Sequence, residues 1–242
     1  MKACLNGGRA AGVPMRPGEL ALDAAAAVAA GAEAVHIHPR DAAGAETLDA
    51  VAVGATVKAV KERCPGTPVG VTTGLWITDG SPTVRLERLR AWADLPEASR
   101  PSFASVNLGE GMFHETVAVL EGAGVATEAG VWSRADVELL QGVPVEKVLI
   151  EVLRTPAAEA MSVADLILER LEQLGVAGPR LLHGEDEACW PLIRYAGRLG
   201  LPTRIGLEDT LADETGAPAR SNAGLVKRAI AVWEGERHRP RT

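Results

Sequence analysis

Short runs rich in β-branched residues alternate with longer runs of helical spacing along the whole chain. The runs predicted as strands are 2–6, 34–38, 69–73, 103–107, 124–128, 147–151, 180–183 and 202–206. The segments predicted as helices are 17–30, 49–63, 82–93, 113–122, 133–141, 156–174, 186–199 and 221–232. This alternation is typical of a parallel sheet covered by helices, because parallel strands need a crossover connection.

Eight such units in 242 residues fit one closed barrel, a fold that typically takes about 250 residues. The competing interpretation is an open, doubly wound sheet. The stretch after the first strand, Asn6-Gly7-Gly8-Arg9, lacks the GxGxxG spacing of that fold. No Pro/Ser-rich linker or charge shift marks a second domain. We therefore predict an α/β fold, a single (β/α)₈ TIM barrel over residues 1–242.

Charge and cysteine usage exclude several classes of partner. Acidic residues outnumber basic ones by 32 to 25, so neither nucleic acid nor an anionic membrane is an expected partner. No run approaches the roughly 20 apolar residues of a membrane span, and no signal peptide is expected. Cys4, Cys64 and Cys189 are far apart and odd in number, which predicts reduced thiols in a cytoplasmic protein.

Polar residues stand at the end of strand after strand, where barrel enzymes have their active sites. Unpaired polar groups are costly to bury, so this repetition predicts a functional site at one rim. The residues at these positions are Asn6, His36, His38, Thr72, Thr73, Ser105, Asn107, Glu128, Glu151, His183, Glu208 and Asp209.

The His-x-His pair of the second strand is the best single motif. Alternate side chains of a strand share a face, so His36 and His38 project the same way and can share a divalent cation. The alternative is a pair of hydrogen-bonded core histidines. The motif alone does not distinguish zinc from iron or manganese.

The segment 204–209 offers the third ligand. Arg204, Gly206 and Glu208 are predicted to fall on one face of the last strand, with a glycine that leaves room between the two charges. Asp209 would then start the loop. One carboxylate can hold a metal while its neighbour acts as base, and Arg204 can keep a carboxylate ionised. The alternative for Asp209 is a turn cap.

Other candidates carry two interpretations each. Thr73 could bind a substrate carboxylate or start a turn. Ser105 and Asn107 share a strand face and could contact substrate or cap a local turn. Glu128 and Glu151 could be acid–base groups or could pair with arginines. No serine-nucleophile elbow or Walker A loop is present in the sequence.

The strings HIHPRD, TTG, SVNLGEGMF and RIGLEDTL together resemble the β-keto acid cleavage enzymes, over about residues 31–231. The resemblance implies a zinc-bearing barrel that uses acetyl-CoA to split a β-keto acid into acetoacetate and an acyl-CoA. It implies one zinc per chain, or another divalent metal, held by His36, His38 and Glu208. Asp209 matches the general base and Arg204 its partner.

The resemblance also places Thr73, Ser105 and Asn107 near the carboxylate and keto oxygen of the substrate, and Glu128 in the pocket wall. By analogy the protein is a homo-oligomer. The chain is shorter than typical members, and the family's N-terminal acidic residue has no counterpart here. A positively charged substrate tail is therefore not expected, and Arg9 favours a neutral or anionic group.

Two further hypotheses stay open at this point. One is a metal-dependent lyase or aldolase that uses the same ligands without coenzyme A. The other is a non-catalytic ligand-binding barrel.

Overall fold

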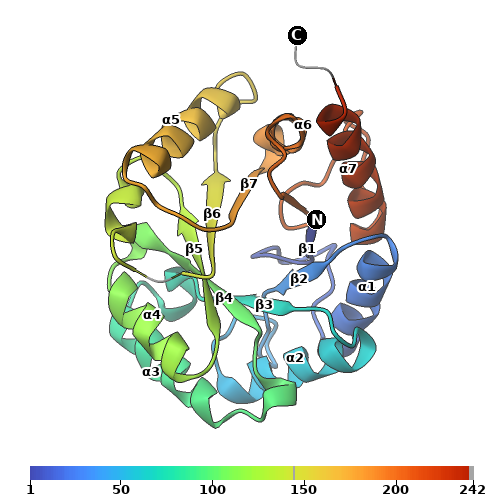
Figure 1. Ribbon diagram of the computed structural model, residues 1–242. Helices are drawn as coiled ribbons and strands as arrows, with labels where there is room; N and C mark the ends of the chain where they lie inside the picture. Colours follow the sequence, from blue (N-terminus) through green and yellow to red (C-terminus); the bar gives the residue numbers. More distant parts are fainter. Residues whose placement is uncertain (144, 240–242) are drawn as a thin grey trace.

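The strands form one parallel sheet curled into a barrel in the computed structural model, which describes residues 1–143 and 145–239 (Figure 1). The strands are β1 (Lys2–Cys4), β2 (Ala34–Ile37), β3 (Val69–Thr72), β4 (Phe103–Asn107), β5 (Ala126–Val131), β6 (Lys147–Val152), β7 (Arg180–Gly184) and β8 (Arg204–Ile205). They pair in the order β7-β6-β5-β4-β3-β2-β1-β8. A hydrogen bond of 3.0 Å from Leu182 N to Pro202 O nearly closes the barrel. The predicted eight-stranded barrel is confirmed.

A ring of helices surrounds the sheet (Figure 1). The α-helices are α1 (Pro17–Ala29), α2 (Ala50–Arg63), α3 (Pro82–Arg90), α4 (Phe113–Gly122), α5 (Ala160–Gln173), α6 (Cys189–Leu199) and α7 (Asn222–Arg237). The 3₁₀ turns are η1 (Leu75–Thr78), η2 (Ala91–Asp94), η3 (Glu97–Ser99), η4 (Leu108–Glu110), η5 (Asp136–Leu140) and η6 (Asp186–Ala188). Within the described residues, no helix has the length and hydrophobicity needed to span a bilayer.

The segment between β5 and β6 departs from the prediction of a helix over 133–141. Only the 3₁₀ turn η5 forms there. The Asp136 carboxylate accepts the backbone N–H groups of Trp132 and Ser133 at 2.9 and 2.8 Å, which folds the chain back directly after β5. Seven α-helices therefore cover the eight strands in the part of the chain that the structure describes.

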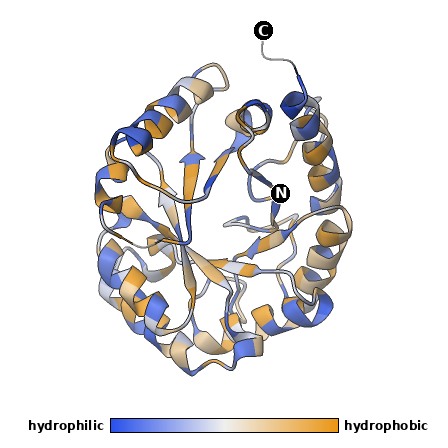
Figure 2. Cartoon of the chain, viewed as in Figure 1, coloured by the Kyte–Doolittle hydropathy of each residue, from blue (hydrophilic) through white to orange (hydrophobic). Residues whose placement is uncertain are grey.

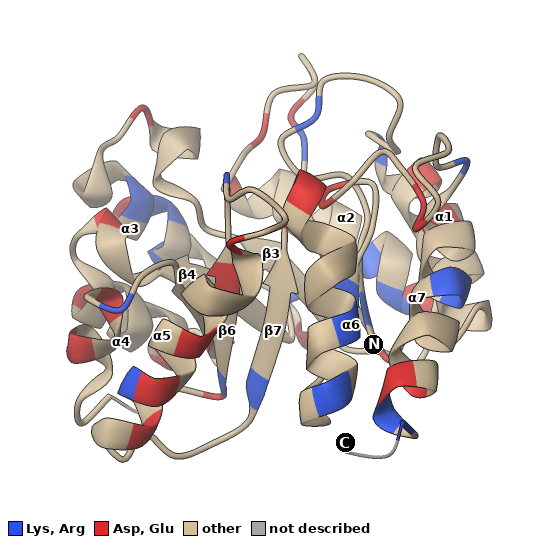
Figure 3. Cartoon of the chain, turned by 90° about the horizontal axis from the view of Figure 1, so that it is seen from above, with Lys and Arg blue, Asp and Glu red and all other residues tan. Residues whose placement is uncertain are grey.

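Strand alternation separates the core from the site. The apolar layer between the sheet and the helices contains the fully buried side chains of Val35, Ile37, Val69 and Val71. The residues that alternate with them on β2 and β3, such as His36, face the barrel axis. Hydrophobic colour accordingly follows the strands and the inner sides of the helices (Figure 2). Basic and acidic residues are interspersed along the outer helices in the cartoon of Figure 3.

The floor of the barrel contains a buried ion pair between Lys2 and Glu128, whose side chains are only 3% and 2% exposed. The Lys2 ammonium also lies 5.5 Å from the centre of the Phe103 ring. Gly124, at a φ of +69°, turns the chain after α4, so that β5 starts at Ala126 and Glu128 lies in its first half. The prediction that Glu128 ends a strand and lines the pocket is therefore wrong.

Candidate active site

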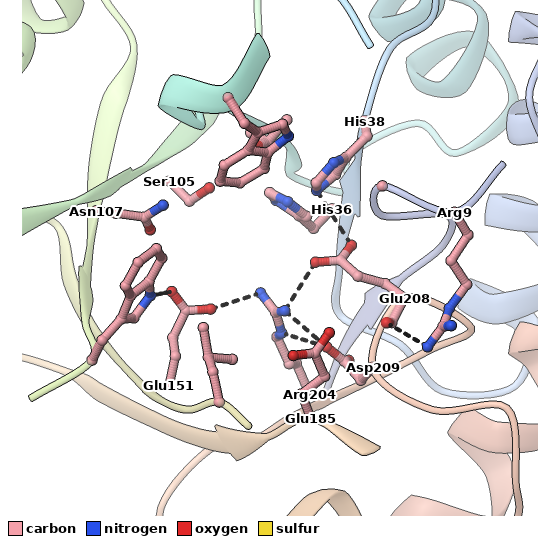
Figure 4. A pocket seen from close by; sticks show the side chains of 15 residues that line it. Arg9, His36, His38, Ser105, Asn107, Glu151, Glu185, Arg204, Glu208 and Asp209 are labelled. Atoms are coloured by element: carbon pink, nitrogen blue, oxygen red, sulfur yellow. Dashed lines mark hydrogen bonds and ion pairs between the residues drawn. The ribbon is translucent and has the colours of Figure 1, made fainter. Parts of the chain in front are cut away.

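The carboxyl ends of the strands surround a cavity of about 270 Å³ (Figure 4). Most side chains that line it are polar or aromatic. The lining residues are Gly8, Arg9, His36, His38, Thr72, Trp76, Ser105, Asn107, Trp132, Glu151, Leu153, Glu185, Arg204, Glu208 and Asp209.

Three of these residues form a cluster with metal-ligand chemistry. His36 and His38, from β2 and the residue after it, and Glu208, after β8, each offer a ligand atom within 4.8 Å of the other two. The Nδ1 atom of His36 and the Oε2 atom of Glu208 are buried and have no hydrogen-bond partner in the described structure. Unpaired buried atoms of this kind are costly. Two imidazoles and a carboxylate fit a divalent cation.

His38 is held in place by a residue that sequence reasoning missed. Its Nδ1 atom lies 2.5 Å from Glu46 Oε1, which leaves Nε2 on the side of Glu208 at 3.6 Å. Glu46 Oε2 in turn accepts the indole N–H of Trp76 at 3.0 Å. A carboxylate on the outer nitrogen typically orients a ligating histidine. Burial lowers the pKa of His38, but Glu208 and Glu46 beside it raise that pKa to about 9.

Arg204 joins the two carboxylates that follow β8. Its Nη2 atom donates to Glu208 Oε1 at 2.9 Å and to Asp209 Oδ1 at 2.8 Å, and its Nε atom donates to Asp209 Oδ1 at 3.1 Å. All three residues line the cavity. The predicted association of these charges is therefore present.

The backbone reaches this arrangement by a turn and not by strand alternation. The strand stops at Ile205, and the N–H of Asp209 donates to Gly206 O at 2.9 Å. The prediction that Arg204, Gly206 and Glu208 share one face of an extended strand is wrong, because Gly206 O accepts the N–H groups of both Asp209 and Thr210 and the chain turns there. A Cβ on Gly206 would lie 1.7 Å from Cys4 O. The glycine thus makes room for the neighbouring backbone and not for the two charges.

The surroundings shift the pKa values of the two adjacent carboxyls in opposite directions. Burial raises the pKa of Glu208, but Arg204 and the two histidines outweigh it and hold that pKa well below its usual range. Burial raises the pKa of Asp209 above its usual range, although Arg204 acts against it. Glu208 therefore suits a permanently charged ligand, and Asp209 suits a group that takes and returns a proton.

A second buried network lies opposite the histidine pair. Glu151, on β6, accepts from Trp132 Nε1 at 3.0 Å through Oε1, and its Oε2 atom lies 2.9 Å from His183 Nε2. Arg204 Nη1 approaches the same carboxylate at 3.5 Å. Burial raises the pKa of Glu151, but His183 and Arg204 overcome this effect and lower it. Of the two open interpretations for Glu151, pairing with an arginine is the one observed.

Of the three residues predicted to contact the substrate, two line the cavity and one does not. Ser105 and Asn107 line the cavity as expected, but the prediction for Thr73 is wrong. The Thr73 hydroxyl donates to the Ser105 carbonyl at 2.6 Å, and Thr72 lines the cavity instead. The reason is the two-residue period of β3, which turns Thr72 inward. Arg9 also lines the cavity and donates to Glu208 O at 3.2 Å.

Two lining residues, Trp76 and Trp132, had no usable signal in the sequence, whereas the segment 183–186 that contains Glu185 is a candidate for a proton donor or a loop cap. Trp76 and Trp132 are half-exposed at the cavity, and Glu185 joins them from the residue after β7. Tryptophans in loops are compatible with many roles. Only the barrel geometry brings these loops to one rim.

The fold and this site define a class: a parallel barrel enzyme with a candidate metal centre and an Arg–Asp pair at the carboxyl ends of its strands. A family model described as "beta-keto acid cleavage enzyme" matches residues 5–242. The chain belongs to this family. It is also 25% identical over 235 residues to the 3-keto-5-aminohexanoate cleavage enzyme of Fusobacterium nucleatum subsp. nucleatum, covering 91% of this chain and 84% of that protein.

Solved structures share the fold. A ternary complex of ObcA with a C4-CoA adduct and oxalate superposes with a TM-score of 0.71 at 19% identity, over 92% of this chain. The chain spans 64% of that ObcA chain and 61% of the ObcA chain in the apo structure. The 3-dehydroquinate dehydratase of Geobacillus kaustophilus HTA426 superposes with a TM-score of 0.64 at 12% identity, over 97% of this chain and 90% of that one.

Proposed function

We propose that the protein is a zinc-dependent enzyme that uses acetyl-CoA to cleave a small β-keto acid, giving acetoacetate and the acyl-CoA of the remaining fragment. One observation carries the proposal. Buried ligand atoms of His36 and Glu208, which have no hydrogen-bond partner among the described residues, lie beside the Arg204–Asp209 pair in one cavity. Family membership supports the reaction class, and ObcA, which shares the fold, has been solved with a C4-CoA adduct and oxalate.

His36, His38 and Glu208 would hold the cation. When bound, a divalent cation polarises a carbonyl oxygen and stabilises negative charge that develops on it. Glu46 fixes the ring of His38 for this role through its Nδ1 contact. Zinc suits a site of two imidazoles and one carboxylate, and other divalent metals share these ligands.

Asp209 acts as the base. Arg204 occupies its Oδ1 atom, whereas Oδ2 is buried and has no partner among the described residues. The free oxygen takes a proton from the carbon between the carboxylate and the ketone. That carbon attacks the thioester carbonyl of acetyl-CoA, and the thiolate leaves. The thiolate then adds to the ketone carbon of the β-keto acid, and the bond between this carbon and the deprotonated carbon breaks. The ketone carbon leaves as part of the acyl-CoA, and Asp209 returns the proton to the other fragment, acetoacetate.

Two measurements test this function. Metal analysis by mass spectrometry, on protein purified without added metal or a metal-binding tag, should give about one zinc per chain. A panel of β-keto acids incubated with acetyl-CoA should then release acetoacetate and a new acyl-CoA. Protein that neither contains nor takes up metal would contradict the proposal. Cleavage without any thioester product would instead favour a lyase that does not use coenzyme A.

A homo-oligomer is a separate proposal that rests on the family resemblance. Light scattering coupled to size-exclusion chromatography tests it directly.

A further inference from the structure

The orientation of the Asn107 amide is set from behind the cavity. Asn107 ends β4, and its Nδ2 atom donates to Glu110 Oε1 at 2.8 Å. Glu110 Oε2 accepts the backbone N–H of Leu75 at 3.0 Å and Arg85 Nη1 at 2.8 Å. A carboxylate beside an arginine only accepts hydrogen bonds, so the amide nitrogen of Asn107 must face it. The amide oxygen is consequently forced to the other side.

Arg85 makes this orientation rigid. Its side chain, on α3, is fully buried, and its Nη2 atom donates to Gly111 O at 2.7 Å and to Thr116 Oγ1 at 3.2 Å. The guanidinium therefore ties α3 to the loop that carries Glu110 and to α4. Turning the Asn107 amide would place two acceptors, the amide oxygen and the Glu110 carboxylate, against each other.

The amide oxygen of Asn107, a residue that lines the cavity, lies over the bare backbone of Gly130. The position that a Cβ on Gly130 would occupy lies 2.5 Å from Asn107 Oδ1 and 2.8 Å from Glu151 Oε1. Figure 4 shows the oxygen of Asn107 on the side of Glu151. Two acceptor oxygens, from the strands β4 and β6 on either side of β5, thus lie close to the position that a larger residue at 130 would fill. The indole N–H of Trp132 is already bonded to Glu151 Oε1 at 3.0 Å.

We propose that Asn107 Oδ1 and Glu151 Oε1 over Gly130 form an acceptor subsite, which binds a hydrogen-bond donor on the acyl tail of the β-keto acid. A hydroxyl or an ammonium supplies that chemistry, and a second carboxylate does not. Arg85 and Glu110 are positioning residues that set the polarity of the subsite. The inference rests on the proposed function. It replaces the expectation that Asn107 contacts the carboxylate or keto oxygen, because both of those groups are acceptors. It also replaces the expectation that the substrate tail carries no positive charge, because the two acceptor oxygens accept from an ammonium as well as from a hydroxyl.

Binding without acetyl-CoA tests the subsite apart from turnover. Dissociation constants are measured by calorimetry on the zinc-loaded protein for 3-oxohexanoate, 5-hydroxy-3-oxohexanoate, 5-amino-3-oxohexanoate and 3-oxoadipate. We expect the hydroxy or amino acid to bind roughly tenfold or more tightly than 3-oxohexanoate, and 3-oxoadipate to bind most weakly. The tighter of the two donor ligands identifies the group. Equal affinities, or a preference for 3-oxoadipate, would overturn the subsite and leave the function intact. Binding of none would overturn both.

Two variants locate the effect. Gly130→Ala fills the space between the two oxygens and should reduce the preference for a donor tail to less than about threefold, with zinc content unchanged. Gly122→Ala, on α4 with no atom near the added methyl group, is the matched control. Glu110→Gln lets the Asn107 amide turn and should lower the same preference while 3-oxohexanoate binds as before. A full preference retained in both Gly130→Ala and Glu110→Gln would contradict the proposal.

Discussion

Arg204 holds Asp209 through two hydrogen bonds to a single oxygen: Nε and Nη2 of the arginine donate to Oδ1 of the carboxylate, at 3.1 and 2.8 Å. The second oxygen of Asp209 is left buried and, among the described residues, without a partner. The arginine therefore fixes the direction of the carboxylate without using its free oxygen. This asymmetry fits the proposed role of Asp209 as a general base, because one oxygen stays available to accept a proton.

Asp209→Asn should keep the fold and the metal while turnover falls by a factor of about 10² to 10⁴, as expected for loss of a general base. Asparagine keeps the contact with Arg204 but cannot accept a proton at its nitrogen. Steady-state kinetics with acetyl-CoA and metal analysis of the same sample check this. Asp186→Asn, at the exposed neighbouring carboxylate, is the control. Near wild-type turnover in Asp209→Asn would remove the residue from the base role.

His38→Ala should lower zinc occupancy because it removes one of three ligand side chains. Glu46→Gln should weaken zinc binding by about 10- to 100-fold, because it leaves the ligand in place but loosens its orientation. Competition with a chromogenic chelator measures both. His114→Ala, on the exposed side of α4, should behave like the unaltered protein. Full zinc occupancy in His38→Ala would exclude His38 as a ligand.

Glu151 should make part of the stability depend on pH. Its pKa is lowered in the folded protein, so its contribution is complete above the unfolded value near 4.3 and is lost as the pH falls through the folded value. Glu151→Gln should reduce the free energy of unfolding by about 3 kcal/mol at pH 7, because Arg204 and His183 lose a charged partner. The difference from the unaltered protein should shrink below about pH 4.

Urea unfolding at several pH values measures this effect. Glu121→Gln, on the exposed side of α4, should change neither the stability nor its pH dependence. A destabilisation by Glu151→Gln that persists undiminished in acid would show that packing, and not charge, is responsible.

Glu128→Gln should lower the stability of the fold without changing the catalytic activity. The substitution leaves Lys2 as a buried charge without its partner and should cost about 3 kcal/mol in the free energy of unfolding. Zinc content and kcat/KM should stay near those of the unaltered protein, because Glu128 lies at the opposite end of the barrel from the histidine pair. Loss of activity in a fully folded variant would argue against this placement.

Local pattern was enough for the architecture and for part of the site. The alternation of strands and helices depends on the periodicity of neighbouring residues, and it predicted all eight strands to within a few residues at each end. The same two-residue period placed His36 and His38 together on the barrel axis. The grouping of Arg204, Glu208 and Asp209 was also predicted, because these residues lie within six positions of one another.

Features that depend on distant contacts were decided only in the tertiary structure. The start of β5 put Glu128 on the floor, and hydrogen bonds from Asp209 and Thr210 to Gly206 O turned the end of a predicted strand into a bend. The orientation of Asn107 depends on Glu110 and, through it, on Arg85 in another helix. Hydrogen bonds between segments far apart in the chain leave no periodic trace in the sequence. They exist only once the barrel brings the loops together at one rim.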